Sequence, residues 1–387
     1  MRALLCPLTS PGYLYPATAL ALELHRRGHE VTLLSAAGAA TAARADGLDV
    51  HDVDALPEPG AFEVSRWFRS SAAQYRAVLE LARARRPDVL VTSVLCPGAL
   101  LAAETLDLPV VVLGLTCHLW TFDAPHTADG ADGADDADRG WRLEQSLAML
   151  DTARQEVGLP ARAPAAGMLP LLGQAFLLRG HPDLEPQGAL LPEQVRHVGP
   201  LWWEPPADPG RLEQAEEFLA RSDRPLAYVH LGRTFGGTTL WPWIDAAFTG
   251  TGHRAVVELG RTEEHRSAPG ADVLTVRLPW MSALLDRADL VVANGTSAPV
   301  LGALLHDRPL LLRPNGGEQR VIAAAALRAG VAAELPVSAA DLAHPAGPVG
   351  ETLADPVLRS RVRRLGEALR QTKSAALAAQ AVEEACR

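Results

Sequence analysis

The stretch that decides the fold reads ANGTSAPVLGAL at residues 293–304 and continues as RPNGGEQ at residues 313–319. It predicts a strand end, a small polar turn, a helix, a second strand and a loop that closes on an acid and an amide. The turn places backbone N–H groups and hydroxyls at a helix N-terminus, where the helix dipole also favours an anion such as phosphate. Glu318 and Gln319 add a carboxylate and an amide at the same end of the sheet, which suits sugar hydroxyls.

Strand and helix patterns alternate along the whole chain, which predicts parallel sheets covered by helices on both faces. We expect strands at 3–7, 29–34, 88–92, 109–113, 226–232, 254–259, 273–276, 290–292 and 310–312, and helices at 16–27 and 355–385. The fold class is therefore α/β, with two similar doubly wound domains. Ligands of such sheets bind at the carboxyl ends of the strands, here expected in a cleft between the domains.

The composition bounds the class of protein. The chain has 387 residues with 48% hydrophobic and 21% charged residues, as in a globular protein long enough for two cores. A net charge of −10 without a basic stripe argues against nucleic acid as a partner. No apolar run is long enough to span a bilayer, and the start of the chain does not resemble a signal peptide. Four widely spaced cysteines argue against disulfides and a zinc site, and we expect a cytoplasmic protein without metal.

Two segments interrupt the alternating pattern. The proline-rich stretch at 201–210 predicts a linker between domains. The acidic, low-complexity stretch at 128–139 predicts a mobile surface loop, because its composition buries little apolar surface.

The motifs at 293–304 and 313–319 resemble the sugar-nucleotide signature of family 1 glycosyltransferases of the GT-B fold. The resemblance is to the bacterial enzymes that decorate macrolides, enediynes and aromatic polyketides, and it implies a role in antibiotic biosynthesis. It implies an acceptor-binding domain at 1–200, a nucleotide-sugar domain at 211–365 and a C-terminal helix at 366–387 that packs back on the first domain. It also implies a TDP- or UDP-sugar as donor substrate and no cofactor.

The donor site follows from the resemblance, residue by residue. Asn294 stands where the family has histidine, and Pro299 stands where it has threonine, which removes one N–H from the phosphate turn. The segment 277–281 matches the part whose backbone pairs with the base, although Trp280 is alternatively a core residue and Gly232 alternatively a tight turn. A turn that no longer binds diphosphate is a further alternative. The implied donor-binding residues are Gly232, Arg233, Thr234, Trp280, Met281, Asn294, Gly295, Thr296, Ser297, Glu318 and Gln319.

Acceptor activation departs from the family pattern. The histidine general base is replaced by Tyr13, and its supporting aspartate by Ser93. A phenol, with a reference pKa of about 10, is a poor base near neutrality. Three explanations remain open: an acceptor that needs little help from a base, another base such as His118, or a relative without activity. Catalytic candidates are therefore Tyr13, Ser93 and His118.

We expect the first domain to hold an apolar acceptor, since such pockets are mostly apolar with a few polar groups. The candidate acceptor-binding residues are Tyr13, Trp67, Phe68, Trp120, Phe122 and Trp141, any of which is alternatively a core residue. The predicted function is inverting, metal-independent transfer of a sugar, often a deoxysugar, to a natural-product aglycone. The alternatives are a catalytically silent auxiliary protein that binds a ligand or a partner transferase, and a sugar-nucleotide epimerase. A homodimer is possible.

Overall fold

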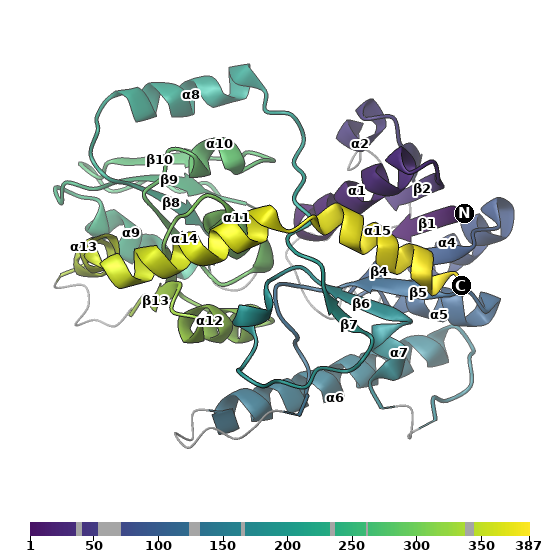
Figure 1. The fold of residues 1–387 in the computed structure, drawn as a ribbon. Helices are drawn as coiled ribbons and strands as arrows, with labels where there is room; N and C mark the ends of the chain where they lie inside the picture. The colour runs from purple at the N-terminus through teal and green to yellow at the C-terminus, as the bar shows by residue number, and fades with distance from the viewer. Residues whose placement is uncertain are drawn as a thin grey trace. The chain divides into compact units, whose positions relative to one another are not determined.

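The computed structural model describes residues 1–35, 41–52, 71–123, 132–163, 167–232, 237–260, 262–336 and 344–387. Contacts divide the chain into two compact units (Figure 1). Unit 1 comprises Met1–Trp203 and Thr372–Arg387, and unit 2 comprises Glu204–Gln371. The chain thus leaves unit 1 at the predicted linker and returns to it for its last helix.

Unit 1 is built on a seven-stranded sheet in which every pair of neighbouring strands is parallel. The strand order is β3-β2-β1-β4-β5-β6-β7. The strands are β1 (Arg2–Cys6), β2 (Glu30–Ser35), β3 (Asp49–Asp52), β4 (Val89–Ser93), β5 (Val110–Leu113), β6 (Ala175–Leu178) and β7 (Val195–His197). The order reverses direction between β1 and β4, which is where ligands bind in a doubly wound sheet.

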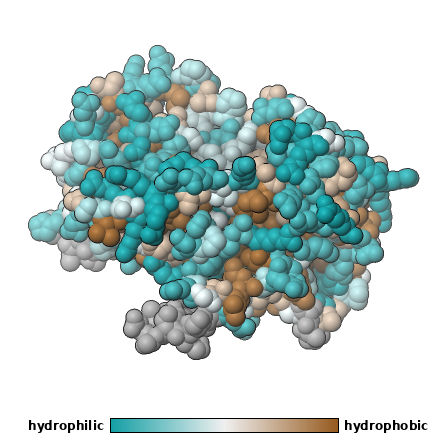
Figure 2. Space-filling view, viewed as in Figure 1, coloured by the Kyte–Doolittle hydropathy of each residue, from teal (hydrophilic) through white to brown (hydrophobic). Residues whose placement is uncertain are grey.

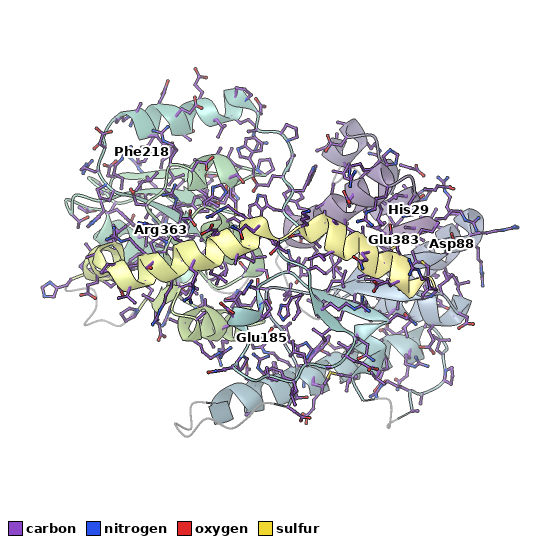
Figure 3. The ribbon with its side chains drawn as sticks, in the orientation of Figure 1. His29, Asp88, Glu185, Phe218, Arg363 and Glu383 are labelled. Atoms are coloured by element: carbon purple, nitrogen blue, oxygen red, sulfur yellow. The ribbon has the colours of Figure 1, made fainter. Side chains whose placement is uncertain are left out.

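The helices of unit 1 cover this sheet. They are α1 (Pro11–Arg26), α2 (Thr41–Ala45), α4 (Ser71–Arg85), α5 (Pro97–Leu106), α6 (Asp132–Glu156), α7 (Leu169–Leu172), the 3₁₀ turn η2 (Pro182–Leu184) and α15 (Ser374–Ala385). Helix α15 packs against α1 through small side chains such as Ala378 and Val382. The Glu383 carboxylate lies 2.9 Å from His29 Nε2 and 2.9 Å from the Arg27 guanidinium, which ties α15 to the turn before β2 (Figure 3).

The acidic stretch at 128–139 is not a loop throughout. Residues 128–131 lie outside the described residues, but α6 begins at Asp132, so the expectation of a loop is wrong from there on. Farther along, Asp138 accepts a hydrogen bond of 2.8 Å from Arg142, one turn later on the same helix.

Unit 2 repeats the architecture with a six-stranded parallel sheet in the order β10-β9-β8-β11-β12-β13. The strands are β8 (Leu226–His230), β9 (Arg254–Glu258), β10 (Val273–Val276), β11 (Leu290–Ala293), β12 (Leu310–Leu312) and β13 (Ala332–Glu334). The order reverses between β8 and β11. Strand β11 is fully buried, as expected of a strand covered by helices on both faces.

The helices of unit 2 end with the long amphipathic helix α14. They are α8 (Pro209–Ala220), η3 (Gly237–Leu240), α9 (Trp241–Ala247), α10 (Ser282–Leu285), α11 (Ser297–Leu305), α12 (Gln319–Arg328), α13 (Gly347–Ala354) and α14 (Pro356–Gln371). Helix α14 packs on α11 at Gly366, where an added Cβ would lie 2.2 Å from the Leu304 carbonyl oxygen. The helix expected at 355–385 is thus two helices, interrupted at Thr372 and Lys373. Figure 2 shows mostly hydrophilic residues over α14, whereas Val357 of α14 and Leu377 of α15 are exposed hydrophobic residues.

Within the described part of the chain, no helix combines the length and the apolar character needed to cross a membrane.

Candidate functional site

The reversal of strand order in unit 2 brings Gly232 and Asn294 together. Gly232 follows β8 and Asn294 follows the neighbouring strand β11. Gly232 has a φ of +77°, and a Cβ at this position would lie 2.3 Å from Asn294 Nδ2. Glycine is therefore required here twice, for the backbone conformation and for the space that the amide occupies.

The buried Asn294 side chain organises the turn before α11. Its Oδ1 accepts the Thr296 N–H at 3.2 Å and the Thr296 hydroxyl at 3.0 Å. This fixes the orientation of the amide, because a backbone N–H needs an acceptor. Nδ2 is then a buried donor with no acceptor among the described residues. A buried donor without a partner costs about 1–3 kcal/mol, which an oxygen atom of a ligand would relieve.

The side-chain amides of Gln319 and Asn315 belong to the same region as the Asn294 amide. A Cβ on Gly295 would lie 2.8 Å from the Gln319 carbonyl oxygen, so the first residue of α12 packs directly on the turn. Gln319 is buried, and its Oε1 accepts the Asn315 N–H at 3.0 Å. In the part of the chain that is described, Gln319 Nε2 and Asn315 Nδ2 have no acceptor. Asn315 was not among the predicted residues, although an amide in the loop after β12 was a visible signal.

The N-terminus of α11 supplies backbone donors beside these amides. Thr296 is its N-cap residue, and both the N–H and the hydroxyl of Thr296 point to Asn294. Pro299 has no N–H, so the first-turn donors of this helix are the N–H groups of Ser297 and Ala298. Glu318 is half-buried immediately before α12. Arg233 and Thr234 lie outside the described residues.

Trp280 is 5% exposed, in the segment that follows β10. The Arg211 guanidinium lies over its ring, 5.4 Å from the centroid, and covers one face. Met281 donates its N–H to the Glu204 carboxylate at 2.8 Å, and this bond fixes the start of α10. Stacking of a base on Trp280 stays a prediction, and it requires the second face of the ring.

In unit 1, Ser93 lies where the strand order reverses, at the end of β4. Its hydroxyl accepts the Leu8 N–H at 3.1 Å, from the loop after β1, and lies 3.3 Å from Cys96 Sγ. Ser93 is thus used to hold the loop that leads into α1. Tyr13 is half-buried in the first turn of α1, where its N–H bonds the Ser10 carbonyl at 2.9 Å.

His118 is fully buried in the loop after β5. The backbone N–H of His118 donates to the Glu185 carboxylate at 2.7 Å, and the Arg139 guanidinium donates to the backbone carbonyl oxygen of His118. Glu185 is labelled in Figure 3. The rings of Trp120, Phe122 and Phe176 lie at 5.7, 6.0 and 6.1 Å from the imidazole, whose two nitrogens have no hydrogen-bond partner among the described residues.

This environment lowers the pKa of His118 to about 3, chiefly through burial and then through the charge of Arg139. The ring is therefore neutral near pH 7. For His118 to take a proton from an acceptor, the aromatic residues that cover it would have to move.

The candidate acceptor residues have different surroundings. Trp120 is buried, donates its indole N–H to Ser146 at 3.1 Å, and lines a small apolar pocket with Leu100 and Met149. Phe122 lies under the Arg139 guanidinium, 4.8 Å from the ring centroid. Trp141 projects from α6 with 56% of its surface exposed. Trp67 and Phe68 lie outside the described residues.

No group of three or more histidine, cysteine or acidic residues among the described ones has a geometry that would hold a metal ion.

Comparisons with known proteins agree with this architecture. The family model described as Glycosyltransferase Family 4 matches residues 17–153. The chain is 27% identical over 362 residues to 4'-demethylrebeccamycin synthase of Lentzea aerocolonigenes, with 84% of this chain and 85% of that protein covered. It is 21% identical over 396 residues to the NDP-glycosyltransferase YjiC of Bacillus subtilis, with 96% and 94% covered.

Solved structures match over nearly the whole chain. The glycosyltransferase of kitacinnamycin superposes with a TM-score of 0.74 at 19% identity, covering 99% of this chain and 98% of that one. The calicheamicin glycosyltransferase CalG4 superposes with a TM-score of 0.70 at 23% identity, with the same coverage. The spinosyn rhamnosyltransferase SpnG, complexed with thymidine diphosphate, superposes with a TM-score of 0.68 at 21% identity, covering 99% and 100%.

Proposed function

We propose that the chain is a glycosyltransferase of the bacterial natural-product type, which transfers a sugar from a TDP- or UDP-sugar to a natural-product aglycone, and its similarity to such enzymes supports this. The observation that carries the proposal is the set of unpartnered buried amide donors beside the N-terminus of α11. Asn294 Nδ2, Gln319 Nε2 and Asn315 Nδ2 all lack acceptors among the described residues, at the carboxyl edge of the unit 2 sheet. A diphosphate and a sugar are rich in acceptor oxygens.

The diphosphate fits the turn between β11 and α11. The N–H groups of Ser297 and Ala298 point out of the first helical turn, and the helix dipole favours negative charge there. Asn294 Nδ2 adds a side-chain donor whose direction is fixed by Thr296. Glu318 and Gln319 then hold sugar hydroxyls at the end of the neighbouring strand β12.

The proposed reaction is a single displacement with inversion at the anomeric carbon. A pair of electrons of the acceptor forms the new bond as the anomeric C–O bond to the diphosphate breaks, and the leaving electron pair passes to that oxygen. The α11 N–H groups and Asn294 stabilise the negative charge that develops on the diphosphate, without requiring a metal. The acceptor loses its proton to water or to a base.

We propose a non-standard acceptor site in unit 1. Ser93 is occupied by the Leu8 N–H, and His118 is held neutral by its burial, so neither side chain replaces a histidine–aspartate pair in this structure. An acceptor with an acidic hydroxyl or a nucleophilic aromatic carbon reacts without a strong base. Tyr13 then orients the acceptor, and the sugar is a deoxysugar of the kind such enzymes often transfer.

The test is titration calorimetry of the protein with TDP and UDP. We expect one of the two to bind, and we expect Asn294→Asp to weaken that binding at least about tenfold, because a carboxylate keeps the bonds from Thr296 but repels phosphate. The control ligand is the nucleoside without phosphates. The unaltered protein and the Asn294→Asp variant should bind it with the same affinity. If the unaltered protein binds neither TDP nor UDP, the proposal is overturned.

If nucleotide binds, the same protein is offered TDP-sugars with a panel of phenolic aglycones. Product formation followed by chromatography, with the anomeric configuration read from NMR coupling, tests the transfer and its inversion. Binding of nucleotide without any transfer across the panel would instead favour an auxiliary protein that acts with a partner transferase.

A further inference from the structure

The turn that joins β4 to α5 contains a leucine with a left-handed backbone. Leu95 has a φ of +71°. Three other non-glycine residues with a positive φ, Arg86, Asp107 and Asp307, lie within two residues of the end of a helix, where this conformation is common. Leu95 instead lies before a helix, so helix termination does not account for it. A positive φ costs a bulky residue energy, so the surroundings of Leu95 have to maintain it.

The residues on either side of Leu95 force the chain to turn there. Val94 still belongs to the sheet, because its N–H donates to the Leu113 carbonyl oxygen at 2.9 Å. Pro97 is the first residue of α5, and the residue before a proline is disfavoured in the α conformation. Cys96 accordingly has a φ of −116° and a ψ of 63°. The reversal between the strand and the helix therefore falls on Leu95.

Helix α5 is packed too closely to move and relieve this turn. A Cβ on Gly98 would lie 2.3 Å from the Ser71 carbonyl oxygen, at the start of α4. The buried Gln74 side chain of α4 accepts the Ala99 N–H at 3.3 Å. The sheet on one side and α4 on the other thus hold the strained turn in the folded protein.

The Leu95 side chain lines the small apolar pocket that Trp120 also lines. The other walls include the rest of the turn at 94–97, Val112 of β5 and Met149 of α6. The pocket lies at the carboxyl ends of β4 and β5, beside the point where the strand order of unit 1 reverses. Ligands of doubly wound sheets bind at such a point.

The polar side chains of this pocket already have hydrogen-bond partners. Cys96 Sγ lies 3.3 Å from Ser93 Oγ. The Trp120 indole N–H donates to Ser146 Oγ at 3.1 Å, and the Ser146 hydroxyl donates to the Arg142 carbonyl oxygen at 2.8 Å. A ligand group in the pocket therefore meets hydrocarbon and aromatic surface, and a hydroxyl buried there would lose its bonds to water without replacement.

We propose that Leu95 is a specificity-determining residue, whose side chain the strained turn holds against the acceptor and which selects acceptors with a bare hydrocarbon or aromatic end. Glycine would adopt the same backbone without cost, so a leucine at this position is useful only for its side chain. Backbone strain of this kind is concentrated at ligand sites. The inference rests on the proposed function, because it takes the occupant of the pocket to be the sugar acceptor.

The first measurement compares the melting temperatures of Leu95→Gly and Leu95→Ala. Both variants remove the side chain from the pocket, but only glycine accepts the left-handed backbone freely. We expect Leu95→Gly to melt about 2–4 °C above Leu95→Ala. At a position without strain the glycine variant would be the less stable of the two, so that order would overturn the argument from strain.

The second measurement is calorimetric titration with 2-naphthol and with 2,6-dihydroxynaphthalene, which carries a hydroxyl at both ends. We expect the unaltered protein to bind 2-naphthol at least about tenfold more tightly, since only its bare ring enters the pocket without losing hydrogen bonds. Both Leu95 variants should bind 2-naphthol about three- to tenfold more weakly, because apolar contact is lost. The ratio of the two dissociation constants should fall toward one, as water gains access to the second hydroxyl.

The matched controls are Asp107→Gly and Asp107→Ala. Asp107 has a φ of +51° at the other end of α5, where it is exposed and does not line the pocket. The glycine variant should again melt above the alanine variant, but both should keep the ratio of the unaltered protein. The ratio is the informative quantity, because a general loss of stability lowers both affinities alike.

The inference is overturned if the folded Leu95 variants keep the ratio of the unaltered protein, or if the unaltered protein does not prefer 2-naphthol. Either result leaves the proposed function intact, since that is tested by the binding of TDP and UDP. A preference for 2-naphthol that depends on Leu95 in a protein that binds neither nucleotide would support the pocket and overturn the proposed function.

Discussion

Gly232 and Asn294 lie so close that a Cβ on the glycine would be 2.3 Å from the amide nitrogen of the asparagine. The contact joins the ends of β8 and β11, the two strands at which the sheet order of unit 2 reverses. The same amide accepts the Thr296 N–H with its oxygen, and its nitrogen has no acceptor in the part of the chain that the structure describes. A change at Gly232 should therefore act on the phosphate turn of the next strand.

We predict that Gly232→Ala lowers the affinity for TDP or UDP by about tenfold or more, because the methyl group displaces the Asn294 amide. Calorimetric titration measures the effect. Gly252→Ala is the control, since Gly252 has a similar φ of +79° but nothing within 4 Å of the added Cβ. Both variants carry the backbone cost of about 1 kcal/mol, so a loss of affinity in the control as well would contradict the steric explanation.

The variant Tyr13→Phe distinguishes two roles of Tyr13, orienting the acceptor and acting as its general base. If Tyr13 only orients the acceptor, removing its hydroxyl should leave kcat within about threefold and act mainly on KM. A general base contributes about 10²–10⁴-fold to the rate, so a loss of that size would show that the phenol removes the proton. Initial rates against acceptor concentration measure both constants.

His118 makes the folded state sensitive to acid. Its pKa of about 3 in the folded protein lies below the ordinary value of 6.5, so the unfolded chain binds the proton first as the pH falls. Stability from this residue is complete above about pH 6.5 and is lost between about pH 6.5 and pH 3. At about pH 5.5 the loss should reach about 1.4 kcal/mol.

The comparison of His118→Phe with the unaltered protein isolates this contribution. The variant cannot titrate at that position, and it fills the same aromatic surroundings. Urea unfolding at several pH values should show the variant gaining relative stability as the pH falls. A constant difference between the two proteins would mean that His118 is not the group responsible. His197, whose pKa is also lowered by burial, remains in both proteins.

Arg254 should be important for the stability of unit 2. It is 2% exposed, and its guanidinium donates to the carbonyl oxygens of Phe218 and Leu219, near the end of α8, and of Ser222, just after it. It also lies 4.4 Å from the centroid of the Phe218 ring, labelled in Figure 3. Arg254→Met would remove the guanidinium donors from these carbonyls, of which only that of Phe218 keeps a backbone donor among the described residues, the Arg221 N–H, and we predict a loss of about 2–4 kcal/mol in the free energy of unfolding.

The control for this prediction is Arg224→Met. Arg224 pairs with Asp272 at the surface with 47% of its side chain exposed, so the variant should lose less than about 1 kcal/mol. Equal losses in the two variants, measured by urea unfolding, would show that the bonds to α8 are not the cause.

Much of the fold was predictable because it follows from local pattern. Buried parallel strands appear as short apolar runs bounded by turns, and the bounds expected at 273–276 and 310–312 are those of β10 and β12. The strands β3, β6, β7 and β13 were not predicted. The strands β3, β7 and β13 have three or four residues and include charged or half-buried side chains, so they present no apolar run. The strand β6 is a buried apolar run of four residues that was nevertheless missed.

The candidate site was also predictable only in part. The order of strand, polar turn, helix, strand and amide was sufficient to place the phosphate turn and to indicate the class of enzyme, since each signal lies within a few residues of the next. The carboxylates of Glu258 and Glu204, which accept the N–H groups of Leu278 and Met281, were missed because these partners are distant in sequence. A carboxylate at a strand end does not show which N–H groups it will meet.

The sequence by itself determined the alternation of strands and helices and the residues available at the turn of 294–299. Only the tertiary structure decided what those residues are free to do. It engages the Ser93 hydroxyl with Leu8, and it buries His118, which lowers the pKa of this residue to about 3. Among the described residues it offers no acceptor to the Asn294 amide nitrogen. The physical reason is that hydrogen-bond saturation and desolvation depend on neighbours that come from other strands, whereas periodicity and turn chemistry are local.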